Sequence, residues 1–252
     1  MSVRLFGLIG FPLTHSFSRK YFTEKFLRES VLDAEYLNFP LVSIRELPYL
    51  IEKQPLLRGL NVTIPYKESV LDFLDEVSPE AAEIGAVNTI KMDRSGKNVR
   101  LLGFNTDVYG FRESLAKQPL LNHRQALVLG TGGASKAVMY VLKQMGITVH
   151  SISRNEGSGV YKTYSALIPE DIKEHTLIVN TTPLGMFPHI ETCPDLPYDA
   201  ISENHLLFDL VYNPSETLFL KKGAGYGARI VNGSDMLIFQ AEKSWEIYGK
   251  DS

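Results

Sequence analysis

The chain has 252 residues, of which 44% are hydrophobic and 22% charged, as in a folded globular protein with a sizeable core. A formal net charge of −3 at pH 7 gives no overall basic field, so nucleic acid is not an expected partner. The lone Cys193 cannot form a disulfide within the chain, and no run reaches the ~18 continuous apolar residues of a membrane helix. We therefore expect a cytoplasmic protein without a membrane partner.

The first hundred residues alternate between strand-like and helix-like segments. Residues 3–9 form an apolar run that no small-residue cleavage site follows, which favours a first strand over a signal peptide. Further β-prone runs are AEYLNF, LRGLNV and AVNTI, and helical patterns occupy residues 18–30 and 43–53. This alternation predicts βα units and mostly parallel sheets.

The second half of the chain starts a new βα series near residue 125. QALVLG has the pattern of a buried strand, TGGAS of a glycine turn, KAVMYVLKQMG of an amphipathic helix and ITVHSIS of a second strand. TLIVNTT and LLFDLVY predict later strands of the same sheet, SDMLIFQAEKSWEIYG predicts a last helix, and residues 155–165 predict a flexible loop. The sequence therefore predicts two α/β domains with a boundary near the helix at residues 109–117.

The glycine turn follows a strand and opens a helix, as a dinucleotide-binding loop requires. Gly130 permits a tight turn, Gly132 lets the backbone approach a pyrophosphate, and the helix from Gly133 onward presents N–H groups to the anion. Ser135 stands where a smaller third residue is usual. The alternative is a strand-to-helix turn that binds no ligand.

The end of the second strand bears on which dinucleotide is bound. An NAD site would have Asp or Glu ~20 residues after the glycines, whereas this chain has Ser153, Arg154 and Asn155 there. A guanidinium pairs with a 2′-phosphate, which a carboxylate would repel, and only the nearby Glu156 opposes this field. The pattern favours NADP over NAD.

Four polar clusters lie where a predicted strand ends or a predicted helix begins. They are Ser16 with Ser18, Asn61 with Thr63 and Lys67, Asn88, and Asn105 with Thr106 and Asp107. Capping of helix ends could account for the serines, the threonine or the aspartate taken singly. Together the clusters mark the crevice at which open α/β sheets bind ligands, and two serines at a helix start suit a carboxylate.

GFPLTHSFS, NVTIPYK, GAVNT, GFNTD, GTGGAS, VNTTPLGM, DLVYNP and GSDMLIFQ occur in this order over nearly the whole chain. In this series the chain resembles the shikimate dehydrogenase family, which reduces 3-dehydroshikimate to shikimate with NADPH on the route to chorismate and aromatic amino acids. The resemblance implies an N-terminal, mostly parallel α/β substrate domain of residues 1–107 and 236–252. It implies a Rossmann-like NADP-binding domain of residues 108–235, with the active-site cleft between the two.

The resemblance also implies residue roles. The catalytic pair would be Lys67 and Asp107. Substrate-binding residues would be Ser16 and Ser18 for the carboxylate, Thr63, Asn88 and Gln240 for the ring hydroxyls, and Tyr212. Cofactor-binding residues would be Gly130, Thr131, Gly132, Gly133, Ala134, Ser153, Arg154, Asn155, Leu210 and Gly233, with no metal. The family often has Asn-Arg-Thr and then a lysine where this chain has SRN without the lysine, which leaves more of the 2′-phosphate to Arg154.

Two other functions remain open from the sequence. Quinate or mixed quinate/shikimate dehydrogenases carry out the same chemistry on a ring with one more hydroxyl beside the carboxylate. A non-catalytic NADPH-binding sensor could keep the fold, although the lysine, the aspartate and the serines are all present. The Tyr-x-x-x-Lys spacing of Tyr21 and Lys25 lies before the glycine turn and predicts a packed helix face instead of a catalytic motif. The expected partners are small molecules, and the chain could be a monomer or a homodimer.

Overall fold

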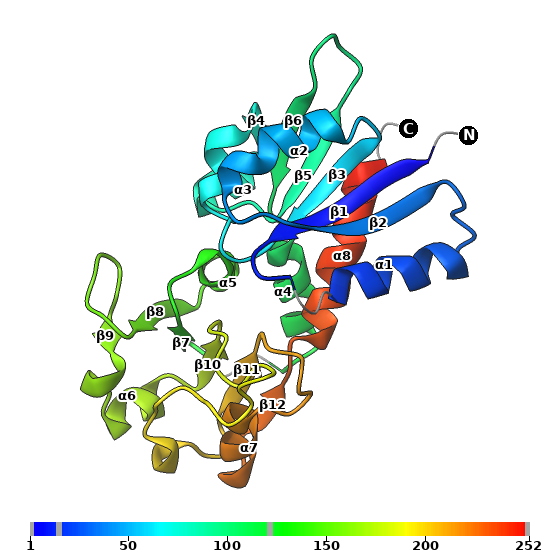
Figure 1. Cartoon of the computed structure of the whole chain (residues 1–252). Coiled ribbons are helices and arrows are strands. Elements are labelled where there is room, and N and C mark those ends of the chain that lie inside the picture. Colours follow the sequence, from blue (N-terminus) through cyan, green and yellow to red (C-terminus); the bar gives the residue numbers. More distant parts are fainter. Residues whose placement is uncertain (1–2, 14–16, 120–122, 250–252) are drawn as a thin grey trace. The chain divides into compact units, whose positions relative to one another are not determined.

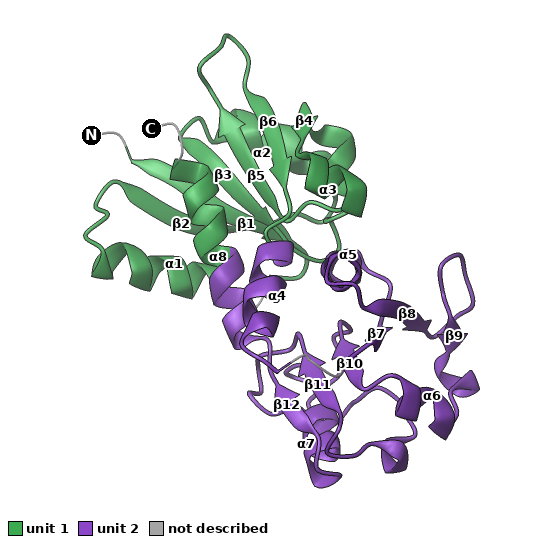
Figure 2. Ribbon diagram, turned by 180° about the vertical axis from the view of Figure 1, so that it is seen from behind, with its two compact units in different colours: residues 1–106, 241–252 green, residues 107–240 purple. Residues whose placement is uncertain are grey.

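The computed structural model describes residues 3–13, 17–119 and 123–249 (Figure 1). By their internal contacts these residues form two compact units, Met1–Thr106 with Ala241–Ser252, and Asp107–Gln240 (Figure 2). The units divide at residues 106/107 and 240/241, whereas the sequence predicts domain boundaries at 107/108 and 235/236. Each unit has its own sheet.

The sheet of the first unit has the strand order β2-β1-β3-β5-β6-β4. The elements are β1 (Arg4–Gly10), α1 (Phe17–Arg28), β2 (Ala34–Pro40), η1 (Ile44–Glu46), α2 (Leu47–Lys53), β3 (Leu57–Val62), η2 (Ser69–Phe73), β4 (Glu76–Val77), α3 (Pro79–Ile84), β5 (Thr89–Asp93) and β6 (Arg100–Phe104). β1 pairs in parallel with β2 and β3, and β4 with β6, whereas β5 is antiparallel to both of its neighbours. The sequence patterns did not predict β6. It forms an antiparallel hairpin with β5 through the turn at residues 94–99.

β1 is buried on both faces because its successive side chains point to opposite sides of the sheet. Leu5 and Ile9 join one apolar cluster, which also contains Leu57 and Leu60. Phe6 and Leu8 join a second, aromatic cluster that includes Phe22, Tyr36 and Tyr248. The near-continuous apolar run that predicts this strand therefore fills two cores at once. β1 therefore lies between the two apolar clusters of the unit.

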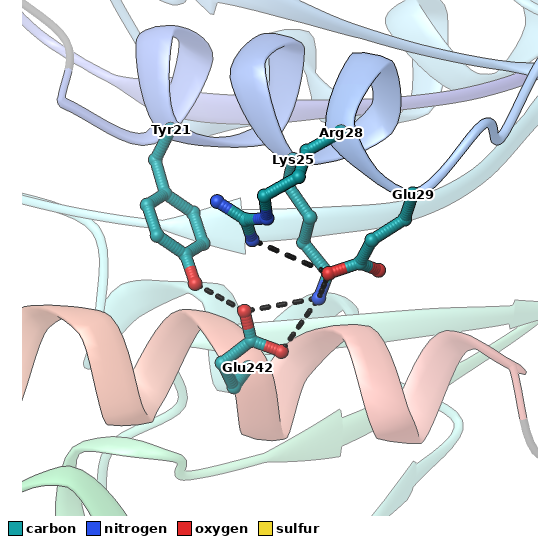
Figure 3. A network of polar contacts seen from close by, with 5 residues as sticks. All are labelled: Tyr21, Lys25, Arg28, Glu29 and Glu242. Atoms are coloured by element: carbon teal, nitrogen blue, oxygen red, sulfur yellow. Dashed lines mark hydrogen bonds and ion pairs between the residues drawn. The ribbon is translucent and has the colours of Figure 1, made fainter.

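A polar network joins α1 to the last helix, α8 (Ser234–Gly249), within the first unit (Figure 3). Lys25 Nζ donates to Glu242 Oε2 at 2.7 Å and to Glu29 Oε1 at 2.9 Å, and the Tyr21 hydroxyl donates to Glu242. Burial by itself would lower the pKa of the Lys25 ammonium, but the bonds to the two carboxylates outweigh it and raise the pKa. Tyr21 and Lys25 thus serve helix packing, as their position in the sequence predicts.

The sheet of the second unit has the strand order β12-β11-β10-β7-β8-β9, with all neighbours parallel. Its elements, besides the start of α8, are α4 (Asp107–Ala116), β7 (Gln125–Leu129), α5 (Gly133–Gln144), β8 (Thr148–Ser153), β9 (Lys162–Thr163), η3 (Tyr164–Ala166), α6 (Pro169–Glu174), β10 (Leu177–Asn180), η4 (Tyr198–Ala200), β11 (Leu206–Asp209), α7 (Leu218–Gly225) and β12 (Arg229–Val231). The order reverses between β7 and β10, as in a doubly wound nucleotide-binding sheet. The Rossmann-like prediction is confirmed.

The predicted loop at residues 155–165 is wrong at its C-terminal end. Lys162 and Thr163 pair with the last residues of β8 as β9, and η3 begins at Tyr164. Tyr161 N donates to Ser151 O at 2.8 Å, so the chain is already tied back to β8 before β9 begins. Glycine and serine content does not reveal such pairing between two strands.

Candidate functional site

Gly130 follows β7 and makes the tight turn that its position predicts. Its φ is +109°, a conformation that favours glycine, and its N–H donates to Ile152 O at 2.8 Å. A Cβ at this position would lie 2.8 Å from Thr181 Oγ1. Both the conformation and the space therefore require glycine here.

Gly132 caps the start of α5 and faces open space. Its backbone is extended, with φ −80° and ψ −179°, and a Cβ there would meet no described atom within 4 Å. Ser135 is fully buried and donates to Gly132 O at 2.7 Å, which satisfies its hydroxyl inside the first turn. The departure at Ser135 therefore fits a loop whose outer face an anionic ligand could approach at the helix N-terminus.

The neighbouring strand end, at β10, closes the other side of this turn. Thr181 donates to Leu129 O through both N, at 3.0 Å, and Oγ1, at 2.6 Å. Asn180 donates to Asp209 Oδ1 at 2.9 Å and accepts from the Thr182 hydroxyl at 2.7 Å. These bonds fix the carboxyl ends of β7, β10 and β11 at the point where the strand order reverses, which is where such sheets bind dinucleotides.

Asp209 is the most perturbed carboxyl group of this edge. It is fully buried and also accepts from Thr217 Oγ1 at 2.6 Å and from Val211 N at 3.0 Å. Burial raises its pKa to about 6, although the three donors oppose that rise. The carboxyl group is engaged in holding β11 and is not aimed at a ligand.

Ser153 ends β8, and Arg154 and Asn155 follow it on the surface. Burial raises the pKa of Tyr164 to about 12, and the positive charge of Arg154 opposes this rise. Arg154 is thus near Tyr164, beside the carboxyl end of β8. An exposed guanidinium is a group that can pair with a phosphate.

Leu210 and Gly233 come together at the end of β11. Leu210 N donates to Asn180 O at 2.9 Å, and Gly233 N donates to Val211 O at 3.1 Å. Tyr212 follows, half-buried, with its pKa raised by burial. Gln240 is buried on α8, where its Nε2 donates to Leu237 O at 2.9 Å.

Within the first unit, Thr63 lies just beyond β3, which ends at Val62. Tyr66 N donates to Thr63 O at 2.9 Å, which closes a turn before Lys67. The carbonyl of Lys67 accepts from Val87 N at 2.7 Å, next to Asn88. This bond holds the backbone of Lys67 beside Val87, the residue before Asn88. Both Thr63 and Lys67 are half-buried.

The other predicted residues lie at helix starts. Ser18 is half-buried in the first turn of α1, and Asp107 is the buried first residue of α4. Thr131 is exposed, whereas Gly133 and Ala134 are half-buried at the start of α5. Ser16 lies outside the described residues. The described residues thus stand at helix starts, as the sequence predicts for groups that bind ligands.

Sequence reasoning missed a group of buried polar side chains in the first unit, which we call the buried polar network. Its members are Tyr36, Asn61, Thr89, Thr106 and Ser244. Asn61 and Thr106 belong to clusters that the sequence marks, whereas Tyr36, Thr89 and Ser244 do not stand out. Ser244 lies in a helix far along the chain from its partners, so only the folded structure reveals its role.

The described parts of the chain suggest neither a metal centre nor a membrane segment. No group of three or more His, Cys, Asp and Glu side chains suited to a metal ion occurs among residues 3–13, 17–119 and 123–249. None of the helices in these ranges has the length and hydropathy that crossing a membrane requires.

Comparison with known proteins relates the chain to one family over nearly all of its length. A family model described as the shikimate dehydrogenase substrate binding domain matches residues 8–90. A shikimate dehydrogenase (NADP(+)) of Carboxydothermus hydrogenoformans is 39% identical over 260 residues, which cover 96% of this chain and 90% of that protein. The chain belongs to the shikimate dehydrogenase family. The resemblance stated from the ordered motifs is confirmed.

Two solved structures show how far the fold of a shikimate dehydrogenase is shared. Shikimate 5-dehydrogenase from Thermus thermophilus, in complex with NADP(H) and shikimate, is 32% identical with a TM-score of 0.84, covering 98% of this chain and 94% of that chain. Quinate dehydrogenase from Corynebacterium glutamicum, in complex with NAD, is 28% identical with a TM-score of 0.84, covering 99% and 94%. The fold alone therefore does not separate the two substrates, and the curated relative at 39% identity favours shikimate.

Proposed function

We propose that the chain is an NADP-dependent shikimate dehydrogenase, which reversibly reduces 3-dehydroshikimate to shikimate on the route to chorismate and aromatic amino acids. The observation that carries the proposal is the relationship to a curated shikimate dehydrogenase (NADP(+)) over 96% of the chain. The protein is an oxidoreductase that acts on a CH–OH group. The substrate domain comprises residues 1–107 and 236–252 in this proposal, and the cofactor domain comprises residues 108–235.

NADP would bind at the carboxyl ends of the strands in the second unit. The open face of Gly132 and the N–H groups at the start of α5 suit the pyrophosphate, together with Gly130 to Ala134. The exposed Arg154, between Ser153 and Asn155, suits the 2′-phosphate. Leu210 and Gly233 would contact the cofactor near its nicotinamide end. When bound, NADPH supplies the hydride.

The substrate would be held by groups that all donate or accept hydrogen bonds. Ser16 and Ser18 would bind the carboxylate, with the start of α1 adding its N–H groups. Thr63, Asn88 and Gln240 would bind the ring hydroxyls, and Tyr212 would add a phenol near the carboxylate. All of these side chains are neutral, so they would bind the substrate through hydrogen bonds and not through ion pairs.

Lys67 and Asp107 would carry out the proton transfer. Reduction of the ketone leaves an alkoxide, which must receive a proton and be stabilised while negative charge develops. The Lys67 ammonium would donate that proton, and in the reverse direction its amine would accept the proton of the hydroxyl. Asp107 would orient the ammonium and bond a substrate hydroxyl. The role requires both groups to reach the same substrate.

We further propose that the protein acts in the cytoplasm on small molecules, as a monomer or a homodimer. The free, half-buried Cys193 is consistent with a reducing compartment.

Initial rates with four substrate pairs test the proposal. Shikimate and quinate are each supplied with NADP and with NAD at matched concentrations. We expect shikimate with NADP to give the highest catalytic efficiency, by at least tenfold. Higher efficiency with quinate would assign the chain to the quinate dehydrogenases. NADPH binding without turnover of either acid would instead indicate a sensor protein.

A further inference from the structure

Two neighbouring strands of the second unit, β10 and β11, end at the same level in residues with short polar side chains. The strands pair in parallel, and their last residues, Asn180 and Asp209, are partners in the register. Both side chains are fully buried, and Asn180 Nδ2 donates to Asp209 Oδ1 at 2.9 Å. A side-chain bond therefore joins the two strand ends in addition to the backbone bonds of the sheet.

Each of these side chains also accepts a bond from the backbone two residues further along the chain. Thr182 N donates to Asn180 Oδ1 at 3.0 Å, and Val211 N donates to Asp209 Oδ1 at 3.0 Å. This is an Asx turn, in which a side-chain oxygen takes the place of the acceptor that a neighbouring strand would supply. The pairing of β10 with β11 ends at the register position where both turns begin.

The donors and acceptors in these two turns are fixed by the backbone. A backbone N–H can only donate, so the end of the Asn180 amide that faces Thr182 N is the oxygen, and the nitrogen donates to Asp209. Burial raises the pKa of Asp209 to about 6, so at pH 7.5 its carboxyl group is ionised and accepts at both oxygens. Its Oδ1 belongs to the two turns, whereas its Oδ2 accepts from Thr217 Oγ1 at 2.6 Å, before α7.

The middle residue of each turn packs against a glycine that is assigned to the cofactor. Thr181 is the middle residue of the first turn, and its Oγ1 would lie 2.8 Å from a Cβ on Gly130. Leu210 is the middle residue of the second turn, and its carbonyl oxygen would overlap a Cβ on Gly233. The backbone course of both turns therefore determines the space beside the glycine turn and beside the start of α8.

We propose that Asn180 and Asp209 are positioning residues of the cofactor site, because their linked Asx turns fix the backbone that NADPH would contact. Both side chains are fully buried, so neither touches the cofactor itself. The inference rests on the proposed function, which assigns Gly130 to the pyrophosphate and Leu210 to the nicotinamide end. A backbone already held in its bound conformation need not be ordered on binding, so loss of a turn weakens the affinity for NADPH.

Asp209→Ala tests the turn after β11, with Thr217→Val as the matched control. Both variants lose the bond between these two side chains, but only Asp209→Ala removes the acceptor of Val211 N. We expect Asp209→Ala to raise the Kd for NADPH about 3- to 10-fold, because the turn must then be ordered on binding. Thr217→Val should lower the free energy of unfolding in urea and leave this Kd unchanged. Equal Kd values for the two variants would overturn the proposal.

A fragment of the cofactor separates positioning from a general loss of structure. Adenosine 2′,5′-bisphosphate carries the 2′-phosphate but no nicotinamide, so Asp209→Ala should leave its Kd unchanged. Asp209→Asn should restore most of the affinity for NADPH, since an amide oxygen still accepts from Val211 N and the amide nitrogen can donate to Thr217 Oγ1. A similar loss of affinity for both ligands in Asp209→Ala, or an Asp209→Asn variant that binds NADPH as weakly, would contradict the proposal.

Asn180→Ala tests the turn after β10 and provides a result even if Asp209→Ala does not fold. It removes both the acceptor of Thr182 N and the donor to Asp209, so the Kd for NADPH should again rise. Thr217→Val serves as the control here too, because it leaves both turns intact. An Asn180→Ala variant that binds NADPH like the wild type would rule the proposal out. A wild-type protein that binds no NADPH would refute the proposed function instead.

Discussion

Gly233 packs directly against the backbone of Leu210, and a Cβ on Gly233 would lie 2.1 Å from the carbonyl oxygen of Leu210. The two residues are far apart in the sequence, and both are expected to contact the cofactor. Their contact joins the carboxyl end of β11 to the start of α8 within the second unit. No side chain fits at this position unless the backbone moves.

Gly233→Ala should therefore impair both stability and cofactor binding. Overpacking against backbone atoms destabilises a fold by about 1–3 kcal/mol. We expect a lower free energy of unfolding in urea and a weaker affinity for NADPH, measured by fluorescence titration. Gly132→Ala is the matched control, since a Cβ there meets no described atom within 4 Å. It should lose NADPH affinity with a smaller loss of stability, because alanine there is only a poorer N-cap than glycine. A loss of stability as large as that of Gly233→Ala would contradict this account.

Arg154→Gln should weaken NADPH binding selectively. Loss of a charge-assisted bond to a phosphate costs about 1.5–3 kcal/mol, which corresponds to about a 10- to 100-fold higher KM for NADPH. The KM for NADH, which has no 2′-phosphate, should not change. Arg124→Gln serves as the control, because Arg124 is also exposed but precedes β7 at the amino end of the strand. Equal changes with NADPH and NADH would exclude the assigned role of Arg154.

Lys67→Ala should remove the proton donor without unfolding the protein. General acid catalysis contributes about 10²- to 10⁴-fold, so kcat should fall by this factor. Lys67 is half-buried and lies in a turn, so we expect little change in thermal unfolding or in shikimate binding measured by calorimetry. Lys97→Ala, an exposed lysine in the turn after β5, is the control. Wild-type turnover in Lys67→Ala would refute the catalytic assignment.

The half-buried His150 should make the folded state less stable in mild acid. His150 Nδ1 lies 2.7 Å from His175 Nε2, and His175 Nδ1 donates to Asp171 O at 2.6 Å. Burial, and then the neighbouring His175, lower the pKa of His150 below its ordinary 6.5, although the charges of Asp171 and Glu174 oppose this. The unfolded state then binds more protons as the pH falls through about 6.5, so stability decreases.

The contribution of His150 can be isolated by comparing urea unfolding at pH 7.5 and pH 5.5. His150→Gln should reduce the difference in unfolding free energy between the two pH values, whereas His189→Gln, at a side chain 78% exposed, should not. Asp209 acts in the opposite sense. Its pKa of about 6 lies above its ordinary value, so its contribution to stability increases as the pH falls through about 6. The contribution of Asp209 is the same in the wild type and in both variants, so it cancels in the comparison.

The sequence determined the features that depend on neighbouring residues. The apolar run of β1 predicts a strand, and the pattern around Gly130 predicts the turn and the helix after it, because backbone conformation and periodicity are local properties. The arginine at residue 154 indicates NADP for the same reason, since it directly follows the second strand of that sheet. Ordered motifs along the chain then indicated the family, which the relatives confirm.

Only the tertiary structure decided the features that depend on distant contacts. Asn61 bonds to Ser244 across 183 positions of the chain, and Gly233 meets Leu210 through the packing of a helix on a strand end. Neither contact leaves a local pattern, because serine in a helix and glycine before one have many other uses. Hydrogen-bond partners and steric room are set by the three-dimensional arrangement of the backbone. A sequence can therefore mark a residue as polar or small, but the fold decides what it touches.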